Sequence, residues 1–99
     1  MNDAAKQMIW RYDFEVKDRH VVAMRAGAHI VHAAASDRML DGIALWAASD
    51  PLATSVGRVI LVRGTGHELG DAAAARYIGT VHAGELVWHV FDGGEWQPQ

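Results

Sequence analysis

The 99-residue sequence contains no cysteine and only two prolines. The absence of cysteine excludes disulfides, thiolate nucleophiles and cysteine-ligated zinc, and it fits a reducing cytoplasm. No apolar run approaches the roughly twenty residues of a membrane-spanning helix. The polar stretch 1–7 does not resemble a signal peptide, because it carries an acid early. We therefore expect a cytoplasmic protein with no membrane segment.

The sequence also lacks a basic excess. Nine Lys and Arg stand against twelve Asp and Glu, for a net charge of −3. Proteins that bind nucleic acid derive much of their affinity from basic groups that neutralise phosphates, so nucleic-acid binding is not expected. A hydrophobic content of 51% is ordinary for a globular protein. We predict one domain at 8–92, with tails at 1–7 and 93–99.

Short alternating segments dominate the chain. From Met8 to Val16, apolar side chains alternate with polar ones, which is the signature of a strand with one polar face. A turn at Asp18 predicts that the next strand returns beside the first. We predict further strands at 20–24, 28–35, 43–48, 56–62, 76–81 and 85–91. Asp71 is expected to cap a short helical turn over 72–75.

This pattern predicts a mainly β fold, because it contains no long amphipathic helix. We expect a single compact β-sandwich, or a partly open antiparallel barrel, of about six to seven short strands with at most one short helical turn. A tight turn at 83–84 places Gly79 opposite Trp88 in the last hairpin. Inward positions are predicted for most of the large aromatic residues, namely Trp10, Tyr12, Phe14, Trp46, Tyr77, Trp88 and Phe91.

The glycine loop after the strand at 56–62 is the candidate ligand site. Successive amides in such a loop can bind an anion, and the neighbouring cationic side chains add charge. The predicted site residues are Arg63, Gly64, Thr65, Gly66 and His67 from the loop, with Thr80, His82 and His89 from the hairpin. The loop lacks the Lys and Ser/Thr of a P-loop. The alternative, which we favour, is that the glycines hold a strained connection while His67 packs locally.

Six histidines invite a metal hypothesis. His29 and His32 are three residues apart, so a regular strand sends them to opposite faces, and only a bulge would bring them together. No zinc-binding pattern, nucleophile elbow or carboxylate pair is present. We predict no metal site, no cofactor and no catalytic residue.

Several short motifs follow one another in a distinctive order. They are Ile9–Tyr12, Ala26–Ala28, Leu45–Ala47, Asp50–Pro51, Gly64–His67, Tyr77–Thr80 and Val87–Phe91. Their order over 8–92 resembles a small uncharacterised all-β family associated with bacteriophages and prophages. The longer loop at 36–42 departs from that pattern.

The resemblance implies a setting but no activity. It implies a non-enzymatic binding protein in the cytoplasm of a host bacterium, acting as an inhibitor of a host protein or host-defence component. The alternative is a protein that binds or sequesters a small, nucleotide-like signalling ligand at the Gly64–His67 loop. Exposed strand edges would also permit a homodimer.

Overall fold

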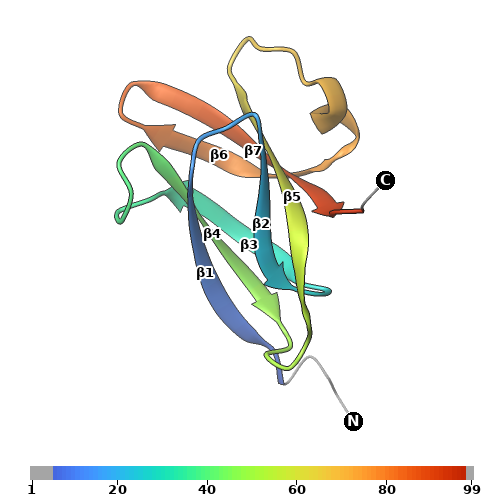
Figure 1. Cartoon of the computed structure of the whole chain (residues 1–99). Helices are drawn as coiled ribbons and strands as arrows, with labels where there is room; N and C mark the ends of the chain where they lie inside the picture. The colour runs from blue at the N-terminus through green and yellow to red at the C-terminus, as the bar shows by residue number, and fades with distance from the viewer. Residues whose placement is uncertain (1–5, 98–99) are drawn as a thin grey trace.

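The computed structural model describes residues 6–97, which form seven strands and a short 3-10 helix (Figure 1). The elements are β1 (Met8–Glu15), β2 (Arg19–Arg25), β3 (His29–Ala35), β4 (Gly42–Ser49), β5 (Ser55–Gly64), η2 (Gly70–Ala74), β6 (Arg76–Ala83) and β7 (Leu86–Glu95). The predicted tails lie partly outside the described residues. β7 runs into the stretch predicted as the C-terminal tail, and the N–H of Trp96 still donates to the Gly57 carbonyl at 2.7 Å.

Two antiparallel sheets confirm the predicted mainly β fold. One has the strand order β1-β4-β3 and the other β2-β5-β7-β6. The sheets do not join into a closed barrel. Two antiparallel sheets that do not close agree with the expectation of a sandwich or a partly open barrel, and we describe the pair of sheets as a sandwich.

The prediction that the second strand returns beside the first is wrong. β1 pairs with β4, whereas β2 crosses to the other sheet and pairs with β5. The crossover places the rings of Phe14 and His20 5.1 Å apart. The turn is also tied to the far sheet, because the Val62 N–H donates to the Asp18 carbonyl at 3.0 Å. The chain thus places β1 and β2 in different sheets and does not form a local hairpin from them.

The core lies between the two inner faces. Ile30, Ile43 and Leu45 of the smaller sheet have no exposed surface, and neither do Ile60 and Val90 of the larger one. Burying each such side chain contributes about 1.5–3 kcal/mol relative to leaving it in water. These alternating aliphatic residues therefore hold the sheets together.

The aromatic residues are less uniformly buried than predicted. Phe14 and Phe91 are buried, but Trp10 is 41% exposed and Tyr77 is 53% exposed. The inward assignment is wrong for Tyr77, which lies beside Phe91 on the outer face of its sheet, and for Trp46, which lies opposite Arg11 on the polar face. Trp10 does face inward, opposite the buried Ala47, but it stays partly exposed. Trp10 lies near the end of the edge strand β1, and Tyr77 packs edge-on against Phe91 with ring centres 5.6 Å apart. Tyr77 is therefore covered on one side by Phe91, and Trp10 borders the groove between β1 and β2.

The register of the last hairpin differs from the predicted one by two residues. Ala83 pairs with Leu86, Val81 with Trp88, and Gly79 with Val90. The turn uses Gly84, whose positive φ of 64° suits glycine, and not Ala83 as a turn residue. A shift of two residues preserves the faces of both strands, so Thr80, His82 and His89 still share one face.

The short helix is observed, but its predicted cap is wrong. η2 begins at Gly70 after Leu69, and no side chain caps it. The Asp71 carboxylate instead accepts a hydrogen bond from Arg63 at 2.6 Å. The buried Ala72 of η2 belongs to a small cluster with Leu61 and Phe91. η2 therefore covers part of the outer face of the larger sheet.

The two lateral sides of the sandwich differ. On the side that we call the closed side, β3 lies next to β6, and Arg76 donates from Nη2 to the Ile30 carbonyl at 3.0 Å. On the open side, β1 and β2 are the edge strands of the two sheets (Figure 1). A groove of about 320 Å³ separates them, lined by Trp10, Arg11, Tyr12, Ala23, Met24, Arg25 and Ser55.

Candidate functional site

His89 organises the predicted site on the outer face of the larger sheet. The hydroxyl of Thr65 lies 2.8 Å from its Nε2, and the hydroxyl of Thr80 lies 3.0 Å from its Nδ1. The Tyr77 hydroxyl hydrogen-bonds to Thr80 in turn. A neutral imidazole has one donor and one acceptor nitrogen, so it can serve both hydroxyls at once. The structure thus joins the loop, β7 and β6 in one chain of polar side chains.

His67 lies on the other side of the same loop. A Cβ built on Gly64 would lie 2.9 Å from Cε1 and Nδ1 of His67, and 3.4 Å from the ring of Trp88. Only glycine lets the imidazole approach the strand this closely. The His67 N–H also donates to the Gly64 carbonyl at 3.1 Å, and Gly66 has a positive φ of 86°. These contacts agree with the structural interpretation of the two glycines.

The backbone of Arg63 lies opposite His89, but its guanidinium is engaged away from the loop residues that it was expected to join. Its guanidinium donates to the carbonyls of Asp18 at 2.7 Å and Leu69 at 2.9 Å, and it pairs with Asp71. These bonds fasten the β1–β2 turn and η2 to β5. His82 is exposed on β6, opposite Val87. The structure therefore brings the side chains of Thr65, Thr80 and His89 together, whereas the guanidinium of Arg63 contacts two other turns.

A cleft of about 330 Å³ lies beside His67. Its lining consists of Gly64, Thr65, His67, Glu85, Leu86, Val87 and Trp88. We call it the hairpin cleft. Leu86 at its rim is 54% exposed. An indole and two aliphatic side chains suit an apolar group, whereas the lining includes a carboxylate and no Lys or Arg to balance an anion.

The remaining histidines form no metal site among the described residues. No three His, Asp or Glu side chains of residues 6–97 gather at metal-binding distances. A bulge in β3 does turn His29 and His32 toward one face, where His29 pairs with Ala48 and His32 with Trp46. The ring centres of His32 and Trp46 lie 5.6 Å apart, so the bulge brings these two rings into contact. Within the same residues, no helix is long and apolar enough to cross a membrane.

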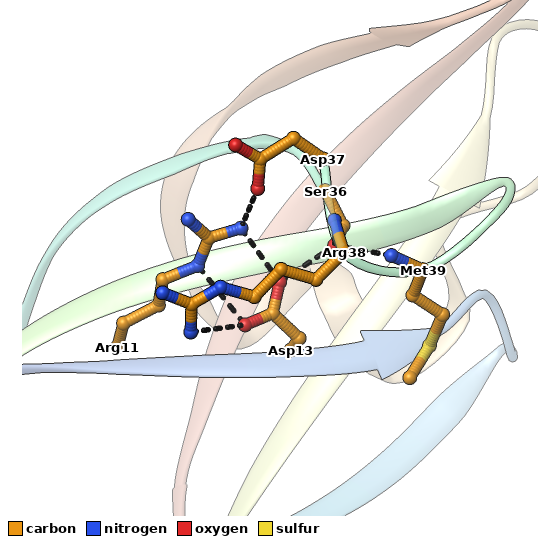
Figure 2. A network of polar contacts seen from close by, with 6 residues as sticks. All are labelled: Arg11, Asp13, Ser36, Asp37, Arg38 and Met39. Atoms are coloured by element: carbon orange, nitrogen blue, oxygen red, sulfur yellow. Dashed lines mark hydrogen bonds and ion pairs between the residues drawn. The ribbon is translucent and has the colours of Figure 1, made fainter.

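A network of charged side chains on the smaller sheet was not anticipated (Figure 2). Arg11 donates from Nε and Nη2 to Asp13 at 3.0 and 2.9 Å, and Nη2 also reaches Asp37 at 2.5 Å. The Ser36 hydroxyl donates to Asp13 at 2.6 Å, and its oxygen accepts the N–H of Met39 at 3.1 Å. The spacing of Arg11 and Asp13 on one strand face signalled the first contact. Nothing in the sequence indicated that the loop at 36–41 would complete it.

The charges in this network stabilise one another. The hydrogen bond from Arg11 holds the pKa of Asp13 below its ordinary value, against the smaller effect of burial. The same guanidinium lowers the pKa of Asp37. Arg11 also lies over the Trp46 ring, with its Cζ 5.1 Å from the centroid. The network therefore ties the β3–β4 loop to β1.

A second ion pair joins the neighbouring strands β5 and β7 of the larger sheet. Arg58 donates from Nε and Nη2 to Asp92, with both distances 2.9 Å, and the two side chains are 11% and 7% exposed. Burial opposes the charge on Asp92, but the hydrogen bonds from Arg58 and from the Gly94 N–H outweigh it, so its pKa lies below the ordinary value. Two parallel bonds fix the geometry of this pair. Its role is structural, because both groups are fully engaged.

The chain belongs to the DUF7352 family, a domain of unknown function, whose family description matches residues 5–99. No curated protein and no solved structure matches it. Because the function of the family is unknown, membership by itself identifies neither a ligand nor a partner.

Proposed function

We propose that this chain is a non-enzymatic binding protein that holds an apolar side chain of a protein partner in the hairpin cleft. The observation that carries the proposal is the cleft's lining, in which Leu86, Val87 and Trp88 offer apolar surface beside His67. Burying one aliphatic side chain of a partner there would contribute about 1.5–3 kcal/mol. Anchors of this kind dominate the energy of many protein interfaces.

The partner that we propose is a host protein or host-defence component in a bacterial cytoplasm. This part rests on the resemblance of the chain to phage and prophage proteins. A small protein that occupies a surface of a larger one acts by blocking it, and such an inhibitor requires no catalytic group. His89 and Asp92, whose side chains are capable of acid–base chemistry, are held in internal hydrogen bonds.

The test compares two leucine variants in a pull-down from bacterial lysate. Leu86→Asp places a charge at the rim of the cleft, and we expect it to lose the proteins that the native chain retains. Leu52→Asp is the matched control, because Leu52 is 91% exposed in the turn between β4 and β5. The control should retain the same proteins. Equal retention by both variants would exclude the hairpin cleft as the binding surface.

The alternative is a small nucleotide-like ligand at the same loop. The observation in its favour is that Thr65 and His67 both line the cleft and can donate hydrogen bonds. Against it, Arg63 is engaged by Asp71 and the backbone. A thermal-shift panel of nucleotides distinguishes the two functions: a shift that disappears in His67→Ala supports the ligand, and no shift with any nucleotide excludes those ligands.

A further inference from the structure

The outer edge of β1 has no strand beside it among residues 6–97. β1 pairs with β4 on one side only and ends its sheet. Such an edge presents a row of unpaired N–H and C=O groups, and soluble proteins usually cover or disrupt it. β1 carries neither proline nor a bulge, and its Met8 and Ile9 are 52% and 62% exposed. An uninterrupted eight-residue edge with exposed apolar side chains is suited to pairing with another strand.

The sequence of β1 is complementary to itself in one antiparallel register. Two copies that keep their outer faces together can place Arg11 of each copy opposite Asp13 of the other. In the same register Ile9 lies opposite Glu15, and Tyr12 lies opposite its own copy on the inner face. Arg11 and Asp13 already pair with each other within each chain. Directly opposite side chains have their Cβ atoms about 5 Å apart, so in this register the two ion pairs lie side by side and antiparallel, with each guanidinium beside the carboxylate of the other copy.

The neighbouring registers are disfavoured by charge. Sliding one strand by two residues in one direction puts Arg11 opposite Arg11 of the second copy. Sliding it by two residues in the other direction puts Asp13 opposite Asp13. A shift by a single residue turns the outer face of one copy toward the inner face of the other. Charge and side-chain alternation therefore select the same register.

This register also accounts for the open side of the sandwich. An antiparallel pair with matched faces has its two-fold axis perpendicular to the sheet, so both larger sheets lie on the same side. The two β2 edges then face each other across the axis, and Trp10 lies opposite Phe14 of the second copy. Trp10 is 41% exposed at the groove between β1 and β2. The pairing therefore covers apolar surface that the single chain leaves in water.

We propose that the occupant of the open side is a second copy of this chain. β1 of each copy pairs antiparallel with β1 of the other, with Arg11 opposite Asp13, and the two three-stranded sheets become one sheet of six strands. The interface is isologous, because each copy contributes the same strand. It is separate from the hairpin cleft, which lies at the β5–η2 loop and the β6–β7 turn.

Single cysteine variants test both the pairing and its register, because the chain contains no cysteine of its own. Ile9 and Glu15 are exposed and lie directly opposite each other in the proposed dimer, within the separation that a disulfide spans. Mixing Ile9→Cys with Glu15→Cys under mild oxidation should give a disulfide-linked heterodimer. Each variant alone should link at least tenfold less, because six residues separate the like positions. Leu52→Cys mixed with Glu15→Cys is the control for random collision.

Sedimentation equilibrium of the native chain completes the test. It should show a dimer whose dissociation constant rises at least tenfold in Trp10→Asp, a substitution at a half-exposed position. A native chain that remains monomeric would overturn the proposal. So would a native dimer whose Ile9→Cys and Glu15→Cys variants link no better than the Leu52→Cys control, since that dimer would use another surface.

Discussion

The closed and open sides of the sandwich are built from edge strands of similar length but behave differently. On the closed side, β3 meets β6, Ile30 is fully buried, and Arg76 crosses from one sheet to the other. On the open side, β1 and β2 leave a groove, and Trp10 is 41% exposed. The closed side buries its own apolar residues, whereas the open side leaves an aromatic side chain partly in water.

The difference arises from the side chains that face inward at each edge. The inner face of β3 presents Ile30 and Ala33, which pack closely enough for the edges to meet. The inner face of β1 presents Trp10 and Tyr12, which line the groove between β1 and β2. Only near the turn, where Phe14 meets His20, do rings of the two strands touch. The groove therefore leaves apolar surface for a second molecule.

Ile30→Ala, on the closed side, should cause the largest loss in the free energy of unfolding. Removing a fully buried aliphatic side chain from the closed side leaves a cavity, and such substitutions typically cost about 2–5 kcal/mol. Urea denaturation followed by circular dichroism measures the loss. Val31→Ala, at the neighbouring position that is 46% exposed, should cost less than about 1 kcal/mol. Similar losses in both variants would show that the closed side is not packed as described.

Asp92→Asn should have the next largest effect. The substitution leaves the Arg58 guanidinium largely buried without a charged partner, which costs about 3 kcal/mol. Asp18→Asn is the control, because Asp18 is exposed in the β1–β2 turn. Denaturant midpoints compare the two variants. A loss no larger than that of the control would contradict the structural role of the ion pair.

Acid should destabilise the protein by protonating one carboxylate in each of the two ion-pair networks. Asp13 and Asp92 both have a lowered pKa in the folded protein. Their stabilising effect is complete above the ordinary aspartate pKa of about 4, and it is lost as the pH falls through the lower folded values. The free energy of unfolding, measured from pH 7 down to pH 2, should therefore decrease below about pH 4. The decrease should be shallower in Asp92→Asn, and an unchanged slope would count against the ion pair.

Trp10→Ala should have the smallest effect on the stability of the single chain. Its ring is too exposed to contribute as a core residue does, so we expect a loss of about 1 kcal/mol in dilute solution. The same substitution should weaken self-association much more strongly, because the dimer buries the ring. Denaturation at two protein concentrations separates these effects. A loss of 3 kcal/mol or more in dilute solution, the cost typical of a core ring, would show that Trp10 belongs to the core.

Alternation along the chain was sufficient to predict the mainly β fold and the positions of the strands. The strict pattern at Met8–Val16 predicted a strand that the structure shows at Met8–Glu15, and its polar face holds Arg11 and Asp13 as expected. Period-two patterning assigns faces but not neighbours, so the crossing of β2 to the other sheet was missed. Similarly, the exposure of Trp10 depends on which edge lies opposite, and that is a property of the assembled sheets.

Part of the candidate site was predictable from the alternation of side chains along the strands. Residues on one strand face of a hairpin stay together even when the register shifts by two, so Thr80 and His89 met as expected. The guanidinium of Arg63 did not join them, because it donates to the carbonyls of Asp18 and Leu69. Those acceptors come from other turns, and local sequence gives no signal for such contacts.

Hydrogen exchange at two protein concentrations tests the central claim most directly. The amides of β1 that point away from β4 should exchange quickly in dilute solution and become protected as the concentration rises. The amides of β3 and β6 on the closed side should keep the same protection throughout. Protection of β1 that does not change with concentration, or that is already as strong as in the central strand β4, would contradict an open side that pairs with a second copy.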